Sequence, residues 1–153
     1  MRVVIVYYGK GQDEMRIMVK TDHFGLETES EVLVYGVLDG EAKKTLEMQT
    51  RLFPGCDGAK AVEKEEAIVL SDRVRNVTLP IMRCSEEGAH GEHGASSGRI
   101  DPEQVRYLQT RGFSEMEARK MLMRAKLMQA VYRVQNPKKR EWLREKISDI
   151  IET

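Results

Sequence analysis

The first two thirds of the chain alternate apolar and polar residues with a period of two, the pattern of strands with one buried face. This alternation predicts six strands, at Val3–Tyr8, Met15–Lys20, Glu31–Leu38, Thr45–Leu52, Glu66–Leu70 and Val77–Arg83. Turn residues separate them, at Gly9–Gly11, Asp39–Gly40, Pro54–Gly55 and Asp57–Gly58. Short strands without intervening helices exclude a doubly wound α/β fold and favour a sandwich, a barrel or a stacked β-solenoid. No strict repeat distinguishes these three architectures.

From Ile100 the apolar spacing becomes helical. Asp101 is the expected N-cap of a first helix with Pro102 in its first turn, and Ser114 with Glu117 forms a capping box for a long second helix. Asn136–Pro137 opens a last helix. The expected buried stripes are Val105 and Leu108 on the first helix, Ala118, Met121, Leu122, Ala125, Met128 and Tyr132 on the second, and Leu143, Ile147, Ile150 and Ile151 on the third.

These patterns predict a mainly β region followed by a helical region. We divide the chain into a strand region at residues 1–99 and a C-terminal helical domain at residues 100–153. A length of 153 residues suits one domain or one domain with an appended helical piece.

Composition narrows the class of protein. Apolar residues make up 41% of the chain and charged residues 33%, and no run of about 18 apolar residues is present, so no membrane span is expected. The apolar segment at Met1–Val6 is too short for a signal peptide, which predicts a cytoplasmic protein. Cys56 and Cys84 are accordingly expected to be reduced.

Charge is divided unequally between the two regions. Residues 1–98 hold 17 acidic and 12 basic residues, whereas residues 99–153 hold 13 basic and 8 acidic ones. A solvated helical surface explains this split, and so does a basic helical face that docks an acidic partner. The basic residues have no aromatic interleaving, so nucleic acid is not an expected partner.

The segment from Cys84 to His93 collects side chains that bind metals. Cys84, His90 and His93 offer a thiolate and two imidazoles, and Glu86, Glu87 and Glu92 offer carboxylates. No CxxC or HExxH spacing is present, and two cysteines are too few for a four-thiolate cluster. This leaves two interpretations: a partial metal site completed by another subunit, or a flexible loop with solvated histidines after a buried Cys84.

Catalytic signals are weak. A nucleophilic pair of Cys84 and His93 requires hydrogen-bond reach and a third group that orients the base, and the spacing indicates neither. Gly9–Gly11 lacks the Gly-Lys-Ser/Thr ending and the following helix of a phosphate-binding loop. We therefore expect no enzymatic activity. Methionines at positions 116, 121, 123 and 128 indicate adaptable packing, in the core or against another protein.

Two runs resemble a known family. His93–Asp101 (His-Gly-Ala-Ser-Ser-Gly-Arg-Ile-Asp) and Tyr107–Glu115 (Tyr-Leu-Gln-Thr-Arg-Gly-Phe-Ser-Glu) resemble the C-terminal part of the SufB/SufD proteins of the SUF iron–sulfur assembly system. Leu38–Gly40, Ile68–Ser71 and Thr78–Pro80 fall where that family has similar segments. The resemblance covers about Val32 to Met128 and is most specific from His93 to Ala125.

The resemblance implies a truncated right-handed parallel β-helix capped by a C-terminal helical domain. It also implies a scaffold role beside the ABC-type ATPase SufC, which would dock on the helices from Pro102 to Arg133. The scaffold would pair with itself or with a SufB-like paralogue. No cofactor would be held tightly by this chain alone, and an iron–sulfur cluster or iron would be bound transiently at the subunit interface.

The residues of the family's motifs match this sequence only in part. His93 matches the histidine of the family's His-Gly-Ala or His-Glu-Ala motif, and Cys84 matches a cysteine that commonly ends the preceding strand. The turn that holds the assembly cysteine in SufB-type subunits reads Ser71–Val74 here, and Gly94 replaces their glutamate, which favours a SufD-like or short divergent form. The implied metal ligands are His93 and Cys84, with Glu86 and Glu92. The alternative is a metal-free interaction module that binds protein through the strand region and the basic helices.

Overall fold

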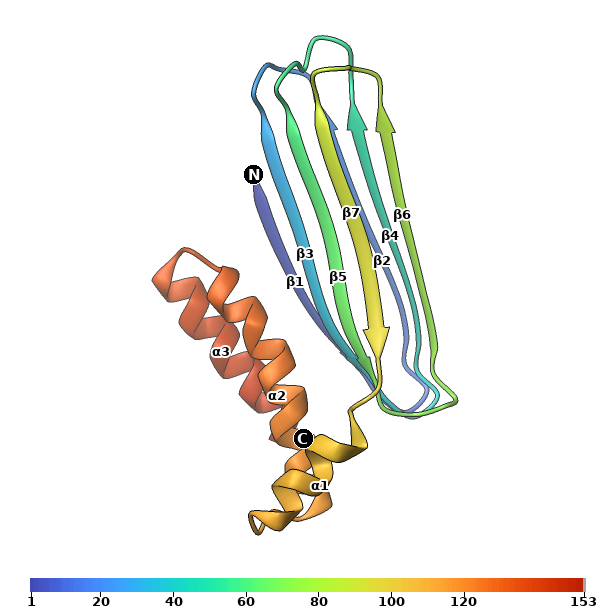
Figure 1. Ribbon diagram of the computed structural model, residues 1–153, viewed down its shortest axis with the longest axis vertical. Helices are drawn as coiled ribbons and strands as arrows, with labels where there is room; N and C mark the ends of the chain where they lie inside the picture. Colours follow the sequence, from blue (N-terminus) through green and yellow to red (C-terminus); the bar gives the residue numbers. More distant parts are fainter. Residues whose placement is uncertain (153) are drawn as a thin grey trace.

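The computed structural model describes residues 1–152, which form a β-solenoid followed by three helices (Figure 1). The strands are β1 (Arg2–Gly9), β2 (Glu14–His23), β3 (Glu29–Leu38), β4 (Lys43–Leu52), β5 (Lys60–Val69), β6 (Arg75–Cys84) and β7 (His90–Gly98). The helices are α1 (Pro102–Thr110), α2 (Glu115–Arg133) and α3 (Pro137–Glu152). The predicted order of strands followed by helices is confirmed.

The strands form two parallel sheets that face each other. One sheet has the order β1-β3-β5-β7 and the other has the order β2-β4-β6, so the chain alternates between the two sheets as it climbs. Figure 1 shows the strands of the two sheets running in opposite directions. We call one strand from each sheet a rung. This parallel stacking is the β-solenoid among the architectures that the sequence left open, and it matches the β-helix that the resemblance implied.

The rungs repeat at a nearly constant length. Arg2 pairs with Glu31, 29 residues further on, and Lys43 pairs with Arg75, 32 residues further on. These spacings differ because the corners between strands differ in length, which is why the sequence shows no strict repeat.

Six strands lie where the alternation predicted them, but β5 is longer than predicted and a seventh strand was not predicted. The strand β7 was not predicted, because a Gly-, Ser- and His-rich stretch has low intrinsic strand preference, yet hydrogen bonding to β5 makes it a strand. The strand β5 begins at Lys60 rather than at Glu66, because Glu63 and Glu65 face the interior where apolar side chains are expected.

A tight corner joins β3 to β4. Gly40 has a φ of 66°, and a Cβ atom at this position would lie 2.8 Å from the backbone nitrogen of Gly11 in the corner below. Only glycine tolerates both the left-handed backbone and this close stacking. The predicted turns at Gly9–Gly11, Asp39–Gly40, Pro54–Gly55 and Asp57–Gly58 all lie at corners.

The space between the two sheets is the first core. Residues that point into it are called inward, and they include Val32, Val34 and Leu38 of β3 and Leu46 and Met48 of β4, all nearly completely buried. The predicted alternation along β4 is confirmed, because Leu46, Met48, Thr50 and Leu52 are buried and their neighbours are not.

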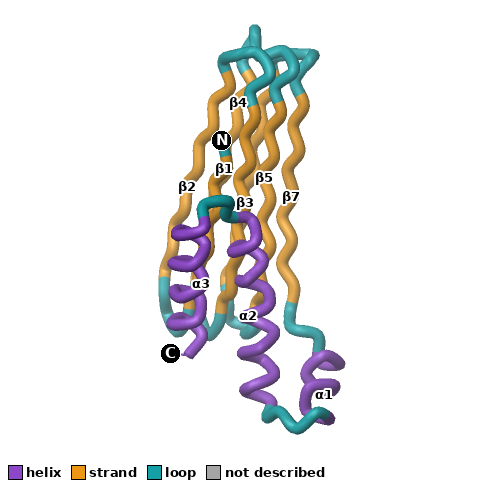
Figure 2. Tube along the Cα trace, turned by 90° about the vertical axis from the view of Figure 1, so that its left-hand side faces the viewer, coloured by secondary structure: helices purple, strands orange, loops and turns teal. Residues whose placement is uncertain are grey.

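The helices cover the outer face of the sheet that contains β1, β3 and β5, as Figures 1 and 2 show. Leu33, Tyr35 and Val37 of β3 pack in a second core with Leu127 and Val131 of α2. The strand region and the helices therefore share this second core. In the part of the chain that the structure describes, no helix is both long and apolar enough to cross a membrane.

The predicted helix caps are confirmed. The side chain of Asp101 accepts a hydrogen bond from the backbone nitrogen of Glu103, and Ser114 and Glu117 form the reciprocal capping box. The side chain of Asn136 accepts a hydrogen bond from the backbone nitrogen of Lys139 at the start of α3.

The predicted buried face of α2 is only partly right, because Ala118 is buried and Leu122 and Met128 pack against the core as predicted, but other members of the stripe do not. Its buried residues are Ala118, Met123, Leu127, Ala130 and Val131, whereas Met121 and Tyr132 are exposed. Apolar residues surround much of this helix, so periodicity alone permits two stripes. Contacts with β3 on one side and with α3 on the other select the observed one.

Candidate functional site at the open end of the solenoid

The last rung leaves the interior of the solenoid uncovered. Strands β6 and β7 end the two sheet orders, and no strand of residues 1–152 pairs with their outer edges. The inward residues of β6 are consequently only half-buried: Asn76, Thr78, Pro80 and Met82. Their partners on β4, one rung below, are buried. Polar side chains of the last rung are therefore within reach of solvent or of a second protein, whereas those of the rung below are buried.

His93 faces this opening. It pairs in register with Glu63 of β5, which points inward, so the imidazole also lies on the inward side of β7. Because no rung covers it, His93 is exposed.

His90 and Glu92 lie on the opposite, outward side of β7. The Nε2 atom of His90 lies 3.7 Å from the Oε1 atom of Glu92, and the Nζ atom of Lys64 lies 3.6 Å from the Oε2 atom of the same carboxylate. The two predicted imidazoles thus lie on different faces of one strand.

Cys84 ends β6 at the corner that leads to β7. Its thiol donates a hydrogen bond to the carbonyl oxygen of Glu86 over 3.1 Å, and the Glu86 carboxylate accepts one from the backbone nitrogen of Gly55 over 2.7 Å. Cys84 is exposed, so the predicted buried thiol is wrong. Cys56 is buried beside this corner, and burial, followed by the charge of Glu86, raises the pKa of its thiol.

The structure keeps Cys84 and His93 apart. A Cβ atom on Gly91 would lie 2.1 Å from the Sδ atom of Met82, so these two positions face each other across the opening. Cys84 lies two residues beyond Met82 toward the corner, and His93 lies two residues beyond Gly91 away from it. Four strand positions correspond to about 13 Å. Among residues 1–152, no three histidine, cysteine, aspartate or glutamate side chains are placed to hold one metal ion.

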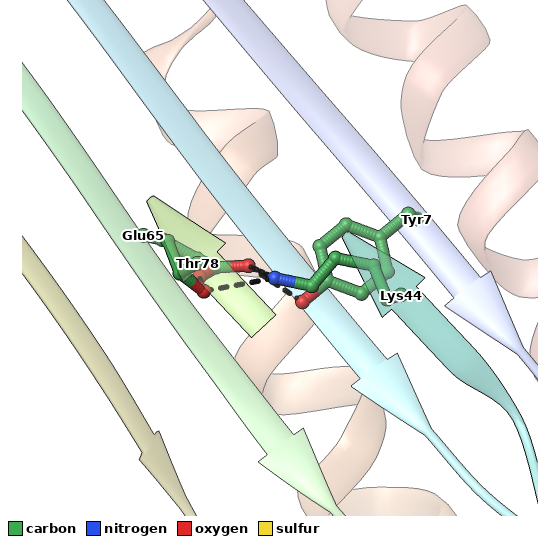
Figure 3. Close-up of polar contacts among 4 residues, drawn as sticks. All are labelled: Tyr7, Lys44, Glu65 and Thr78. Carbon is green, nitrogen blue, oxygen red and sulfur yellow. Dashed lines mark hydrogen bonds and ion pairs between the residues drawn. The ribbon is translucent and has the colours of Figure 1, made fainter. Parts of the chain in front are cut away.

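A buried ion pair lies one rung below the opening. Figure 3 shows its polar contacts. The Nζ atom of Lys44 donates a hydrogen bond to Glu65 over 2.6 Å and another to the hydroxyl of Thr78 over 3.0 Å. The Tyr7 hydroxyl donates to the same Glu65 oxygen over 2.8 Å, and the Thr78 hydroxyl donates to the other. The side chains of Lys44 and Glu65 are 0% and 1% exposed. Glu65 therefore accepts hydrogen bonds from three donors, and the Lys44 ammonium neutralises its charge.

Burial alters the ionisation of this cluster. It lowers the pKa of the Lys44 ammonium, and the adjacent Glu65 carboxylate partly offsets that effect. Burial and the charge of Glu65 raise the pKa of Tyr7 well above its ordinary value, so Tyr7 acts as a hydrogen-bond donor.

Glu63 is a second buried carboxyl with a different environment. The Thr50 hydroxyl donates a hydrogen bond to its Oε1 atom over 2.6 Å, but its Oε2 atom is buried and has no hydrogen-bond partner among the described residues. Burial raises the pKa of Glu63, and the Thr50 hydrogen bond and the charge of His93 offset the effect in part. Chemically, the opening presents one imidazole above one incompletely satisfied carboxyl.

Sequence reasoning missed these interior polar residues. One signal was present for Lys44, because it has the same period-two phase as Leu46, Met48 and Leu52. A charged residue in the buried phase of a strand indicates a buried partner. The partner itself was not predictable without the register of the rungs.

The chain matches a known protein family. Residues 1–126 match the family model described as SUF system FeS cluster assembly, SufBD core domain. The chain is similar to the iron–sulfur cluster assembly protein SufD of Bacillus subtilis, with 29% identity over 118 residues, which are 77% of this chain and 27% of that protein. It is also similar to an iron–sulfur cluster assembly SufBD family protein of Mycobacterium leprae, with 26% identity over 146 residues, which are 90% of this chain and 37% of that protein.

A relative from a third organism gives a similar match. An iron–sulfur cluster assembly SufBD family protein of Pyrococcus horikoshii is 32% identical over 96 residues, which are 63% of this chain and 18% of that protein. The chain thus spans well under half the length of these relatives. The SufB/SufD resemblance found in the sequence is confirmed.

Proposed function

The chain belongs to the SufBD core-domain family of the SUF system, and on that premise we propose that it is a scaffold subunit of iron–sulfur cluster assembly. In this role it contributes partial ligation at a subunit interface and docks a SufC-like ABC ATPase through its C-terminal helices. The cluster, or the iron that enters it, is cargo that passes through the interface.

The open end of the solenoid is the observation that carries this proposal. The outer edges of β6 and β7 present unpaired backbone donors and acceptors, which favour pairing with strands of a second subunit. The exposed, inward-facing His93 would then lie between the two subunits. The second subunit is another copy of this chain or a SufB-like paralogue.

The other predicted ligands contribute in different ways. Cys84 and Glu86 lie together at the corner of the same open end, so a partner strand reaches them along the edge of β6. Glu92 lies on the outer face of β7, on the opposite side from His93, so we leave it out of the proposed interface site. His93 is therefore the proposed principal ligand, and the partner subunit supplies the remaining ones.

Exposed apolar side chains support docking at the helices. Tyr107 of α1, Phe113 in the following turn, and Met116 and Met121 of α2 are between 40% and 67% exposed. Basic residues such as Arg111 and Lys120 lie among them in the sequence. Aromatic residues, methionine and arginine are enriched at protein interfaces.

Replacing His93 by alanine is expected to lower the cluster yield about tenfold, the scale found when metal sites lose a supporting group. The measurement is visible absorbance and bound iron after anaerobic reconstitution with ferrous iron, sulfide, the ATPase and the paralogue. His90→Ala is the matched control, because this imidazole lies on the same strand but faces outward. Equal yields from His93→Ala and the unaltered chain would contradict the proposed ligand role.

Replacing Met116 or Met121 by glutamate is expected to weaken retention of a SufC-like ATPase about tenfold, because a charge would enter an apolar contact. Co-purification and surface-based binding measure the effect. Met18→Glu is the control, since Met18 is 48% exposed and belongs to β2, in the sheet opposite the one that α2 packs against. Unchanged retention by both helix variants, or equal loss with Met18→Glu, argues against docking at this surface.

A further inference from the structure

We propose that Glu63 and His93 together bind one divalent metal ion, with Glu63 supplying a carboxylate oxygen from inside the solenoid. The inference rests on the proposed function, because it treats the open end as the place where metal enters. Its new element is Glu63, a buried residue outside the Cys84–His93 segment.

The environments of the two buried carboxyls carry the argument. Glu65 is neutralised by Lys44 and accepts further hydrogen bonds from Tyr7 and Thr78. Glu63 is equally buried, at 1% exposed, yet within residues 1–152 its side chain accepts a hydrogen bond from Thr50 alone. No lysine or arginine among the described residues pairs with it. Burying a carboxylate oxygen without a partner is costly, so this position calls for a cation or a proton.

Strand register places an imidazole beside the unsatisfied oxygen. Glu63 and His93 are in-register partners on neighbouring parallel strands, and both are inward. Neighbouring strands lie about 4.8 Å apart, and metal–ligand bonds from imidazole nitrogen and carboxylate oxygen are about 2.0–2.2 Å. The separation of these two strands is therefore compatible with one ion that bridges the two side chains.

The supporting residues also suit this role. Thr50 holds the Oε1 atom of Glu63 over 2.6 Å, which fixes the carboxyl plane and leaves Oε2 directed away from that hydrogen bond. Ligating carboxylates are commonly oriented by such an outer hydrogen bond. Two protein ligands leave the other coordination positions open, which suits a transferred ion such as Fe²⁺ better than a structural one.

The test is anaerobic calorimetric titration of the purified chain with Co²⁺ alone, with the visible spectrum of the bound ion recorded in parallel. The unaltered chain is expected to bind one Co²⁺. Glu63→Gln and His93→Ala are each expected to weaken that binding about tenfold or more. Glu63→Gln keeps an acceptor for Thr50, and circular dichroism confirms that the variant is folded. Glu63→Asp, which keeps the charge but shortens the side chain, is expected to bind more weakly than the unaltered chain.

Two controls address the outward face. Glu92→Gln and His90→Asn remove the exposed pair on the other side of β7 and are expected to leave Co²⁺ affinity unchanged. If Glu92→Gln and His90→Asn lose Co²⁺ binding while Glu63→Gln and His93→Ala keep it, the ion is bound by His90 and Glu92 and the inference is overturned. It is also overturned if the unaltered chain binds no Co²⁺ or if Glu63→Gln binds it normally.

The cluster-assembly assay separates this inference from the proposed function. If Glu63→Gln binds Co²⁺ normally while His93→Ala still lowers the cluster yield, only the role of Glu63 fails. If Glu63→Gln loses Co²⁺ but no variant changes the cluster yield, the ion site stands and the assembly role fails.

Discussion

Replacing Lys44 by methionine is expected to lower the free energy of unfolding by about 3–5 kcal/mol, the usual cost of leaving one member of a buried ion pair alone. Lys44 and Glu65 are almost completely shielded from water by both sheets. Without the ammonium, Glu65 retains Tyr7 and Thr78 as donors but has no neutralising charge. Urea-induced unfolding followed by circular dichroism measures the loss.

Two comparisons isolate the buried charge as the cause. Lys43→Met removes the neighbouring lysine, whose pair with Glu14 is exposed, and is expected to cost about 1 kcal/mol or less. The double variant Lys44→Met with Glu65→Gln removes both charges and is expected to recover most of the stability. Equal stability of the two single lysine variants would refute a stabilising role for this pair.

The second large effect is expected from a single added methyl group. In Gly36→Ala the new Cβ atom would lie 1.9 Å from the Cζ atom of Tyr7, so the ring must move. Tyr7 is held by its 2.8 Å hydrogen bond to Glu65, and moving the ring breaks this hydrogen bond. Overpacking costs about 1–3 kcal/mol and the lost hydrogen bond about 1 kcal/mol more. Thermal and urea unfolding measure the sum.

Gly94→Ala is the matched substitution. Gly94 lies on the last strand, and no atom lies within 4 Å of the place that an alanine Cβ atom would take. Alanine is therefore expected to be neutral or slightly stabilising there. In the double variant Gly36→Ala with Tyr7→Leu, a smaller side chain replaces the tyrosine ring and makes room for the methyl group. That double variant is expected to lose less stability than the two single losses added together. Strict additivity would show that the ring is not the obstacle.

The parts of the fold that local chemistry determines were predictable. The alternation along β4 predicted its buried face, and Asp101 and Ser114 identified the starts of two helices. In each case the signal lies within about ten residues of sequence. The parts determined by distant partners were not predictable. The sequence of β7 has little strand preference, and the orientation of α2 depends on which faces β3 and α3 present.

The same distinction applies to the candidate site. His93 was identified from its motif, but its inward direction follows from pairing with Glu63, 30 positions earlier. Proximity in sequence suggested a group of Cys84, His90 and His93, and the strand pleat separates them. Lys44 and Glu65 meet across the two layers because of corner lengths that no local pattern specifies.

The unequal spacing between partner positions has a consequence for how this fold tolerates changes in length. Extra residues at a corner leave every strand with its original faces, as the offsets of 29 and 32 residues illustrate. One residue inserted within a strand reverses the faces of all residues that follow it in that strand. We therefore expect this fold to accept added or deleted residues at its corners, and added or deleted strands only as complete turns of its coil.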